Sequence, residues 1–438
     1  GYEAISSPYQ FELSLLSTLD KRIAFTDIVG HPVSIEILQA DGSPRYIHGL
    51  VRSFAQAGAD DWYASYTAHV VPSIWFLSQR VNSRVFQKKN VTDIIEQVLG
   101  DAGVSNYQLQ CQGSYEALEY CVQYRESDLA FISRLMEEYG IFYFFEHAAK
   151  QHTLVLADRT NAHQPCPGQS KVRYQRATGG ALPDDVVTAW TLQQEFRTGK
   201  FSLTDYNFET PSSNLLASEP STVRVAGNDK AEMFEYPGRY GKVANGTTLA
   251  RIRMQSEEAG HLQATGAGTC RSFVSGCRFS LSEHYRGDVN ADYVLVEVRH
   301  AASAGSYAPN GSAGDGAHYE NEFTCIPLAV PFRPARRTAK PVVQGLQPAL
   351  VVGKSGEEIW VDKYGRVKVQ FYWDRVGKKD DNSSCWVRVA QPWAGKNWGF
   401  VALPRIGHEV MIACVDGDPD RGLVVGTGYS AVQMPPYA

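Results

Sequence analysis

Near the C-terminus, residues 357–375 read EEIWVDKYGRVKVQFYWDR. Within it, Val367, Val369 and Phe371 alternate with polar residues. An apolar period of two is typical of a half-buried β-strand. The segment from Asp362 to Gly365 has the composition of a turn that leads into this strand. The pattern predicts one strand of a small β-barrel.

Three further blocks complete the predicted barrel. They read CWVRVAQPW (385–393), WGFVALPRIGHEV (398–410) and VDGDPDRGLVVG (415–426). In the last block, Asp416, Asp418 and Asp420 have the opening spacing of a calcium loop, but Arg421 and Thr427 stand where such a loop needs Gly and Glu. We interpret this block as a tight acidic turn between two strands.

The composition indicates a globular protein. A length of 438 residues suggests about three domains, and 43% hydrophobic content allows a sizeable core. The formal net charge of −5 disfavours nucleic acid or an acidic membrane as a partner, because such binding needs clustered Lys and Arg. The eight cysteines contain no C-x-x-C pair, so we interpret most of them as buried free thiols of a protein that folds in the cytosol.

The first 80 residues show the pattern of successive short strands, which predicts a barrel or sandwich. Apolar and polar residues alternate, and Asp41-Gly42 supplies a turn. The expected strands cover residues 11–15, 33–37, 46–54 and 63–71.

The period then changes to that of helices. A helix is predicted over 90–99, capped by Asn90 or Thr92, and a longer one over 127–140. Ser127 is the expected N-cap of the longer helix and Gly140 its end. The apolar run at 141–145 predicts a covered strand, with 153–157 as its hairpin partner.

From about 185 to 330 the pattern is mainly β again, with strands expected over 293–300 and 319–326. Residues 301–318 are rich in Ala, Gly and Ser and are predicted to form a long loop. Four prolines then accompany Arg333, Arg336, Arg337 and Lys340. This segment, from Pro331 to Pro348, has two interpretations. It can be a domain boundary or a structured basic groove that contacts a neighbouring subunit, and the two are compatible.

The sequence contains fragments that resemble motifs of common enzymes, but in each of them specific residues do not fit the motif. Gly353-Lys354-Ser355 ends like a phosphate-binding loop, but Pro348 stands where the first Gly is needed. Glu137 and Glu138 are adjacent on a helix and point in different directions, so a solvated helix end is favoured over glycosidase carboxylates. His147, His152 and His163 are spaced irregularly and are assigned surface or turn positions. We expect no enzyme activity, no cofactor and no metal.

Aromatic residues are frequent in the predicted barrel, where large amphipathic rings fill cores or interfaces. A five-stranded barrel can also bind single-stranded nucleic acid on stacked aromatics beside residues such as Arg366, Lys368 and Arg388, but the acidic net charge argues against it. The candidates for barrel-core or interface positions are Trp360, Tyr372, Trp386, Trp393 and Trp398.

These barrel blocks, in this order, resemble the oligomer-binding (OB) barrel of the VgrG family, the spike proteins of bacterial type VI secretion. The resemblance extends over nearly the whole chain. It is carried by GYEAIS and FEL (1–6 and 11–13), YRESDLAFISRLMEEYGI (124–141), YPGRY (236–240) and PFRP (331–334). Each segment is modest alone, but their shared order makes the resemblance specific.

The resemblance implies a mainly β fold with a smaller α+β portion, like the hub and needle-base proteins of contractile phage tails. The expected domains are a first hub-like β-barrel (1–80), a mixed α+β segment (81–185), a second hub-like β-barrel with insertions (186–335) and a five-stranded OB-fold barrel (345–430). Three chains are expected to form a homotrimer that sits on a hexameric secretion tube protein.

The resemblance also implies a mechanical function and a location. The protein is expected to assemble in the bacterial cytoplasm, to be secreted into the medium or a target cell, and to pierce the target membrane. The chain stops at Ala438, soon after the barrel, so we expect a fragment whose β-helix needle, and contacts to a tip protein and effectors, lie further on. A phage-tail hub and, from another class, a cell-wall glycan hydrolase are the alternatives.

Overall fold

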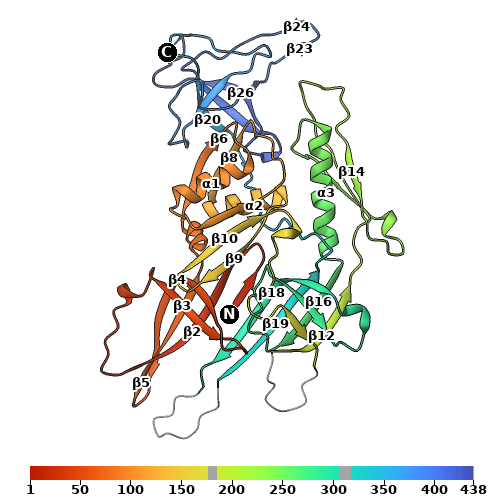
Figure 1. Ribbon diagram of the computed structural model, residues 1–438. Helices are drawn as coiled ribbons and strands as arrows, with labels where there is room; N and C mark the ends of the chain where they lie inside the picture. The colour runs from red at the N-terminus through yellow and green to blue at the C-terminus, as the bar shows by residue number, and fades with distance from the viewer. Residues whose placement is uncertain (176–184, 306–316, 438) are drawn as a thin grey trace. The chain divides into compact units, whose positions relative to one another are not determined.

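The computed structural model describes residues 1–175, 185–305 and 317–437, which form two compact units (Figure 1). Unit 1 comprises Gly1–Trp75, Val104–Gly113 and Met136–Arg336. Unit 2 comprises Phe76–Gly103, Ser114–Leu135 and Arg337–Ala438. The last boundary between the units, at Arg336 and Arg337, lies inside the proline-rich segment that runs from Pro331 to Pro348. The predicted mainly β fold is confirmed.

Unit 1 is built on an 11-stranded sheet with the main order β12-β16-β19-β18-β1-β2-β5-β4-β3. The short strand β1 joins the N-terminal strands to the later ones, because it pairs antiparallel with both β2 and β18. The strands are β1 (Tyr2–Ala4), β2 (Ser7–Thr18), β3 (Pro32–Leu38), β4 (Pro44–Ala59), β5 (Tyr63–Val71), β11 (Lys171–Arg173), β12 (Val187–Gln194), β16 (Leu262–Gly268), β17 (Arg278–Ser282), β18 (Asp292–Ser303) and β19 (His318–Pro327).

The four strands predicted in the first 80 residues are confirmed within β2, β3, β4 and β5. Strands β18 and β19 contain the predicted strands 293–300 and 319–326. Both run further than predicted, because Ala301–Ser303 and His318 continue the antiparallel ladder, with Ser303 opposite His318. Most of the predicted 301–318 loop, residues 306–316, lies outside the described residues.

A smaller sheet packs beside this framework in unit 1. It consists of β7 (Tyr107–Gln110), β10 (Gln151–Ala157) and β9 (Phe142–Ala148), and the last two form the predicted hairpin. Phe142 and Phe144 lie in a buried cluster with Ile5, Val155 and Val294. These residues are close to fully buried, as expected for the continuous apolar run.

The sequence prediction missed the longest helix, α3 (Val243–Ala259). It covers one face of a three-stranded sheet made of β14 (Ala217–Pro220), β13 (Lys200–Leu203) and β15 (Glu232–Glu235). Leu249, Ala250 and Met254 pack there against Phe201 and Leu203. Apart from Val243 and Ile252, the rest of the helix is polar or small, so its apolar stripe is too narrow to give a clear helical period.

Unit 2 contains the antiparallel strand pair β6 (Val81–Phe86) and β8 (Cys121–Ser127), helix α1 (Val91–Asp101) and the first two turns of helix α2 (Asp128–Tyr139). Both helices occur where predicted, and Asn90 caps α1 by accepting a hydrogen bond from the Asp93 amide. The Ser127 hydroxyl accepts from the Ala130 amide at the start of α2. Gly140 follows α2 with a φ of 67°, a left-handed conformation that glycine adopts without strain.

The C-terminal part of unit 2 is a five-stranded sheet in the order β21-β20-β25-β26-β22. Two backbone hydrogen bonds between Val367 and Val387, of 2.9 and 2.7 Å, join its two ends and close the barrel. The core is mostly aliphatic, with Val351, Val369 and Ile412 among its members, and also contains Phe371. The strands are β20 (Gln347–Val352), β21 (Lys368–Phe371), β22 (Arg388–Val389), β25 (Glu409–Cys414) and β26 (Gly422–Gly428), with an added hairpin of β23 (Ala394–Gly395) and β24 (Trp398–Gly399).

The cysteine prediction can also be compared with the fold. All eight cysteines are free and five are buried, which confirms the prediction of mostly buried free thiols. Among the described residues, no helix is long and apolar enough to cross a membrane.

Candidate functional site

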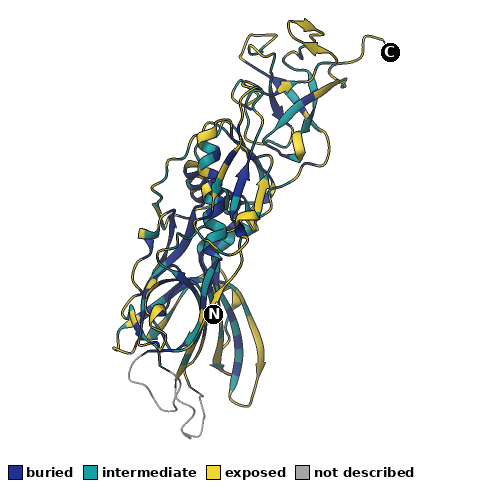
Figure 2. Ribbon diagram, turned by 90° about the vertical axis from the view of Figure 1, so that its right-hand side faces the viewer, coloured by how far each residue is buried: buried dark blue, intermediate teal, exposed yellow. Residues whose placement is uncertain are grey.

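The most exposed aromatic surface of the barrel lies on the β23–β24 hairpin. Trp393 and Trp398 are 66% and 56% exposed, and their rings meet edge to face with centroids 5.1 Å apart. Figure 2 shows this hairpin in the colour of exposed residues. Two large rings held against each other in solvent form a rigid apolar surface.

Two glycines allow the rings to lie on the hairpin backbone. A Cβ atom at Gly395 would come within 2.3 Å of the Trp398 ring. Gly399 has a φ of +141°, and a Cβ there would lie 2.5 Å from the carbonyl oxygen of Trp393. Other residues are disfavoured at both positions, so the packing of the two rings depends on glycine in the hairpin backbone.

The exposed surface continues along the chain beyond the hairpin. Phe400 and Val401 are 54% and 75% exposed, and Phe400 donates a backbone hydrogen bond of 2.8 Å to Trp393. These two residues were not among the sequence candidates. The signal for them is the apolar run from Trp398 to Leu403, which lacks the polar alternation of a half-buried strand. We call Trp393, Trp398, Phe400 and Val401 the aromatic hairpin surface.

The other three predicted site residues lie elsewhere on the barrel. Trp360 and Trp386 are partly buried and stack with ring centroids 6.3 Å apart. The Lys368 ammonium lies 5.1 Å from the Trp386 ring centroid, within the range of a cation–π contact. Tyr372 is 58% exposed and donates a 3.1 Å hydrogen bond to Glu409. None of the five predicted rings belongs to the buried core cluster of the barrel.

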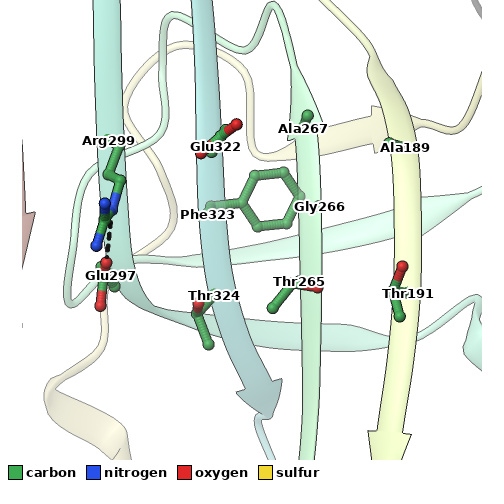
Figure 3. Close-up of a pocket in the computed structure, with 10 residues that line it drawn as sticks. All are labelled: Ala189, Thr191, Thr265, Gly266, Ala267, Glu297, Arg299, Glu322, Phe323 and Thr324. Carbon is green, nitrogen blue, oxygen red and sulfur yellow. Dashed lines mark hydrogen bonds and ion pairs between the residues drawn. The ribbon is translucent and has the colours of Figure 1, made fainter.

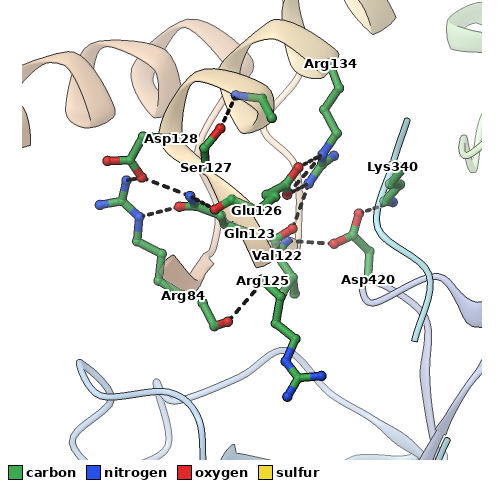
Figure 4. A network of polar contacts seen from close by, with 12 residues as sticks. Arg84, Val122, Gln123, Arg125, Glu126, Ser127, Asp128, Arg134, Lys340 and Asp420 are labelled. Carbon is green, nitrogen blue, oxygen red and sulfur yellow. Dashed lines mark hydrogen bonds and ion pairs between the residues drawn. The ribbon is translucent and has the colours of Figure 1, made fainter. Parts of the chain in front are cut away.

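Within unit 2, the barrel is joined to the β6–β8 strand pair by a cluster of charged residues, which we call the ionic latch. The Lys340 ammonium lies 2.5 Å from Asp418 and 2.5 Å from Asp420. Asp420 also accepts a 2.7 Å hydrogen bond from the Val122 amide of β8 (Figure 4). The predicted acidic turn between β25 and β26 is therefore confirmed, and its carboxylates bind a lysine of the proline-rich segment.

A buried polar network fixes the other end of β8 in unit 2. Asp128 is 1% exposed at the first turn of α2, and Arg84 and Gln123 bind its carboxylate at 3.1 and 2.9 Å (Figure 4). Arg80 binds the same carboxylate at 3.0 Å. The Arg84 guanidinium also donates to Gln123 at 2.7 Å. A negative charge is stabilised at the N-terminal end of a helix. The network thus holds β6, β8 and α2 together.

A second buried pair lies on the next turn of α2. Arg134 binds Glu126 through two nitrogen atoms at 2.8–3.2 Å and donates to the Val122 carbonyl at 2.8 Å. Burial alone would lower the pKa of Arg134, but the hydrogen bonds and charge of Glu126 raise it. Both side chains are about 7% exposed, so the pair fixes α2 on β8.

The prediction that Glu138 lies at a solvated helix end is wrong. Its side chain is 17% exposed in unit 1 and binds the Arg253 guanidinium at 2.7 Å, with Arg239 and Arg336 at 3.9 and 3.8 Å. Arg336 also binds Glu235 at 2.6 and 2.7 Å. Glu138 therefore belongs to a cluster of ion pairs with three arginines, a structural arrangement and not the pair of facing carboxylates of a glycosidase.

The predicted surface positions of the histidines are also wrong. His152 and His163 are 4% and 3% exposed. The ring of His152 lies 3.0 Å from His48 and accepts a 3.0 Å hydrogen bond from the Ser73 amide, while His147 accepts one from the His48 amide. Burial lowers the pKa of His147 to about 3 and that of His152 to about 4. These rings are neutral core residues that unit 1 brings together from three elements.

Unit 1 also has a shallow surface depression of about 390 Å³ (Figure 3). Its floor is a row of three hydroxyl side chains on neighbouring strands, because Thr191 pairs with Thr265 and Thr265 pairs with Thr324. At its edge, Glu297 and Arg299 bind each other at 2.9 Å. No hydroxyl of the row is bonded to a histidine or carboxylate, so the depression lacks the nucleophile–base pair of a hydrolase. Among the described residues, no group of three or more His, Cys, Asp or Glu side chains could hold a metal ion.

Comparison with known proteins agrees with this arrangement. Residues 2–306 match the family model of the phage tail baseplate hub (GPD), and residues 357–429 match that of the type VI secretion system/phage-baseplate injector OB domain. The chain is 39% identical over 437 residues to the type VI secretion system spike protein VgrG1b of Pseudomonas aeruginosa, covering all of this chain and 59% of the relative. VgrG1a of the same organism is 38% identical over 437 residues, again across the whole chain and 68% of the relative.

A solved structure shares the fold. It is that of the Escherichia coli c3393 protein, described as a component of the type VI secretion system with structural similarity to the T4 tail proteins gp27 and gp5. The TM-score is 0.69 at 20% identity, with 98% of this chain and 95% of that chain covered. The chain spans about 60% of the length of the first Pseudomonas relatives it matches. On this evidence, the chain belongs to the VgrG family of type VI secretion spike proteins.

Proposed function

We propose that this chain forms the hub and needle base of a type VI secretion spike and works as a structural protein. The proposal rests on a match to spike proteins that covers the whole of this chain, combined with a barrel that exposes the aromatic hairpin surface. This function does not require any covalent bond to be made or broken. Rigidity and symmetry are sufficient, since a spike transmits force from a contracting sheath to a target membrane.

The proposed assembly is a homotrimer in which each barrel contacts its neighbours near the axis. Large exposed apolar surfaces on a soluble protein mark interaction sites, and tryptophan is enriched among residues that dominate interface energies. Trp393 and Trp398 are both fixed in position before binding, so little side-chain entropy is lost on association. These properties favour the interface role over the core role for the two rings.

The proposed partner of unit 1 is the hexameric tube protein. The large sheet of unit 1 contains an N-terminal group of strands and a later group, joined through β1. Two such groups of strands in each of three chains would give six similar strand groups, a number that matches the six subunits of the tube ring. A tip protein and effectors are proposed as further partners of the assembled spike.

The proposed location follows the same scheme, with assembly in the bacterial cytoplasm and then secretion into the medium or a target cell. Free cysteines agree with folding in a reducing compartment. The net charge of −5 gives no support to nucleic acid as a partner.

The test is complementation in the producing bacterium. Deletion of the gene should abolish release of the tube protein into the medium, and the wild-type gene should restore it. The double variant W393A/W398A should fail to restore release, whereas Tyr285→Ala, which removes a 77% exposed ring of unit 1, should restore it. Normal release from the deletion strain would refute the proposed function.

A phage-tail hub is the second candidate, because the matching model of residues 2–306 is that of a phage baseplate hub. Both machines would use the same trimer. Electron microscopy of purified particles separates them, since a phage origin requires the protein in tails attached to capsids, and a secretion origin requires it in sheathed tubes without capsids.

A further inference from the structure

Three histidines of unit 1 join the tip of the β9–β10 hairpin to the large sheet. His147 and His152 pair with each other across that hairpin, and His48 lies on β4. The Nδ1 atoms of His48 and His152 are 3.0 Å apart, and the His147 Nδ1 atom accepts a 3.1 Å hydrogen bond from the His48 amide. The Nε2 atom of His152 accepts a 3.0 Å hydrogen bond from the Ser73 amide. We call His48, His147 and His152 the histidine cluster.

The two backbone amides decide which ring nitrogens carry protons. A backbone N–H group can only donate, so the ring nitrogen that it meets must be unprotonated. The single ring proton of His147 therefore lies on Nε2, and that of His152 lies on Nδ1. The Nδ1–H group of His152 then donates to the Nδ1 atom of His48, which leaves the His48 proton on Nε2. Each of these hydrogen bonds requires the accepting ring to be neutral.

The charged and titratable groups around the cluster come from four strands. They are Glu3 of β1, Tyr9 of β2, Arg45 of β4 and His300 of β18. The Glu3 carboxylate attracts a proton to the cluster, but it is already bound by His300 at 2.7 Å and by Arg45 at 3.2 Å. The Arg45 guanidinium repels such a proton, and the Tyr9 hydroxyl donates at 2.5 Å to the backbone carbonyl of β4. A positive charge on the cluster is therefore poorly compensated.

We propose that the histidine cluster is an acid-sensitive contact that releases the tip of the β9–β10 hairpin from the large sheet. A proton added to Nδ1 of His147 would face the His48 amide, and a proton added to Nε2 of His152 would face the Ser73 amide. In both cases a donor meets a donor, so the hydrogen bond is lost. The Ser73 hydroxyl, 3.1 Å from the same Nε2 atom, can rotate to accept the new proton, but the amide loses its acceptor.

The tip is the least buried part of this hairpin. Residues 148–150 of the turn are exposed, whereas residues 142–145 at the base are buried. The turn is also held by a 2.6 Å hydrogen bond from the Ser34 hydroxyl of β3 to the Ala149 carbonyl, a bond between groups that do not titrate in this range. Local opening begins in weakly buried segments. Acid should therefore free the tip while the base stays packed.

The pKa values give the direction of the effect. Burial lowers the pKa of His147 to about 3 and that of His152 to about 4, whereas a ring in the open tip has the usual value of about 6.5. The open form binds more protons, so the closed form loses stability as the pH falls from about 6.5 toward 4. For His152 alone, the fraction of open molecules should rise about 30-fold between pH 7.5 and pH 5.

Hydrogen exchange on the full chain measures this opening. Protection factors, which correct for the intrinsic pH dependence of exchange, should fall at least about tenfold at the His48 and Ser73 amides between pH 7.5 and pH 5. The reference is the Leu295 amide, which donates at 2.9 Å to the Cys277 carbonyl in the core of unit 1. At pH 5 the His48 and Ser73 amides should be at least about tenfold less protected than this reference.

The matched variant is H147N/H152Q. The asparagine oxygen replaces the Nδ1 acceptor and the glutamine oxygen replaces the Nε2 acceptor, but neither side chain can be protonated in this pH range. The double variant should lose the pH dependence at the Ser73 and His48 amides. His31→Gln, at an exposed position, should keep it. Nitrogen NMR of the wild-type protein labelled with ¹⁵N-histidine needs no variant, and it should show His152 protonated on Nδ1 at pH 7.5.

Four results would overturn the proposal. They are unchanged protection of the His48 and Ser73 amides at pH 5, equal protection of these amides and the Leu295 amide, the full pH dependence in folded H147N/H152Q, and a proton on Nε2 of His152 at pH 7.5. The proposal goes beyond the proposed function, because the cluster lies within unit 1 and its test does not depend on trimer formation.

Discussion

The indole rings of Trp393 and Trp398 meet edge to face, with centroids 5.1 Å apart, on a hairpin that exposes more than half of each ring. A protein that worked alone would gain nothing from this arrangement, because the rings contribute little to the buried barrel core. The pair is the structural feature of unit 2 that most directly points to assembly.

Removal of the ring pair should weaken association without unfolding the chain. In W393A/W398A the free energy of unfolding should change by less than about 1 kcal/mol, because exposed side chains contribute little to folding. The trimer dissociation constant should rise at least about tenfold, since interface tryptophans often contribute more than 2 kcal/mol. Analytical ultracentrifugation measures association, and Y285A is the matched control. Equal association of W393A/W398A and Y285A would exclude the hairpin from the interface.

Loss of the Lys340 latch should destabilise unit 2. Lys340→Met removes the ammonium that lies 2.5 Å from Asp418, a carboxylate only 4% exposed, and breaking a buried ion pair costs about 3–5 kcal/mol. Denaturant unfolding should show this loss, and hydrogen exchange at the Val122 amide should accelerate. Arg405→Met, which breaks an exposed pair with Glu358, should cost less than about 1 kcal/mol. A similar cost for both variants would contradict a structural role for the latch.

The buried histidines should make unit 1 sensitive to acid. His147 and His152 have folded-state pKa values of about 3 and about 4, below the unfolded value of about 6.5. The unfolded chain then binds more protons below pH 6.5, so stability is lost as the pH falls from about 6.5 toward 4.

The expected loss from His152 alone between pH 7.5 and pH 5 is about 2 kcal/mol. His152→Gln, which keeps an acceptor for the Ser73 amide, should reduce this pH dependence, while His31→Gln at an exposed position should not. Denaturant unfolding at both pH values measures the difference. A pH dependence that is identical in the two variants would refute the role of His152.

The end of α2 should require glycine at position 140. In Gly140→Ala the new Cβ would lie 2.7 Å from Ile252 and 3.1 Å from Arg333, at a φ of +67°. We expect a loss of about 1–3 kcal/mol in thermal or denaturant unfolding. Gly100→Ala in α1, where no atom lies within 4 Å, should instead be neutral or stabilising by up to about 1 kcal/mol. Equal effects would show that neither position constrains the backbone.

Local patterns in the sequence were sufficient to predict much of the fold. Helix α2 has a cap at Ser127, a stop at Gly140 and a clear apolar stripe, so its limits were predicted within one residue. The β9–β10 hairpin was predicted because one strand is almost wholly apolar. In contrast, α3 buries few large side chains, and no local pattern distinguishes it from the surrounding β structure.

The candidate site was predictable in composition but not in geometry. The sequence shows which aromatic residues the barrel contains, yet the fold decides that Trp393 and Trp398 are exposed while Trp360 and Trp386 stack partly buried. The buried role of Glu138 was missed because its arginine partners are about 100 or more positions away. Contacts between distant segments leave no periodic signal in either segment.

The decisive measurement is the mass of the protein in solution, because it shows whether three chains associate. Light scattering over a concentration series should show a mass that rises from 48.5 kDa toward a trimer of 3 × 48.5, about 146 kDa. The rise follows from mass action if the aromatic hairpin surface joins three chains. A stable dimer, or a monomer at every concentration, would contradict the account.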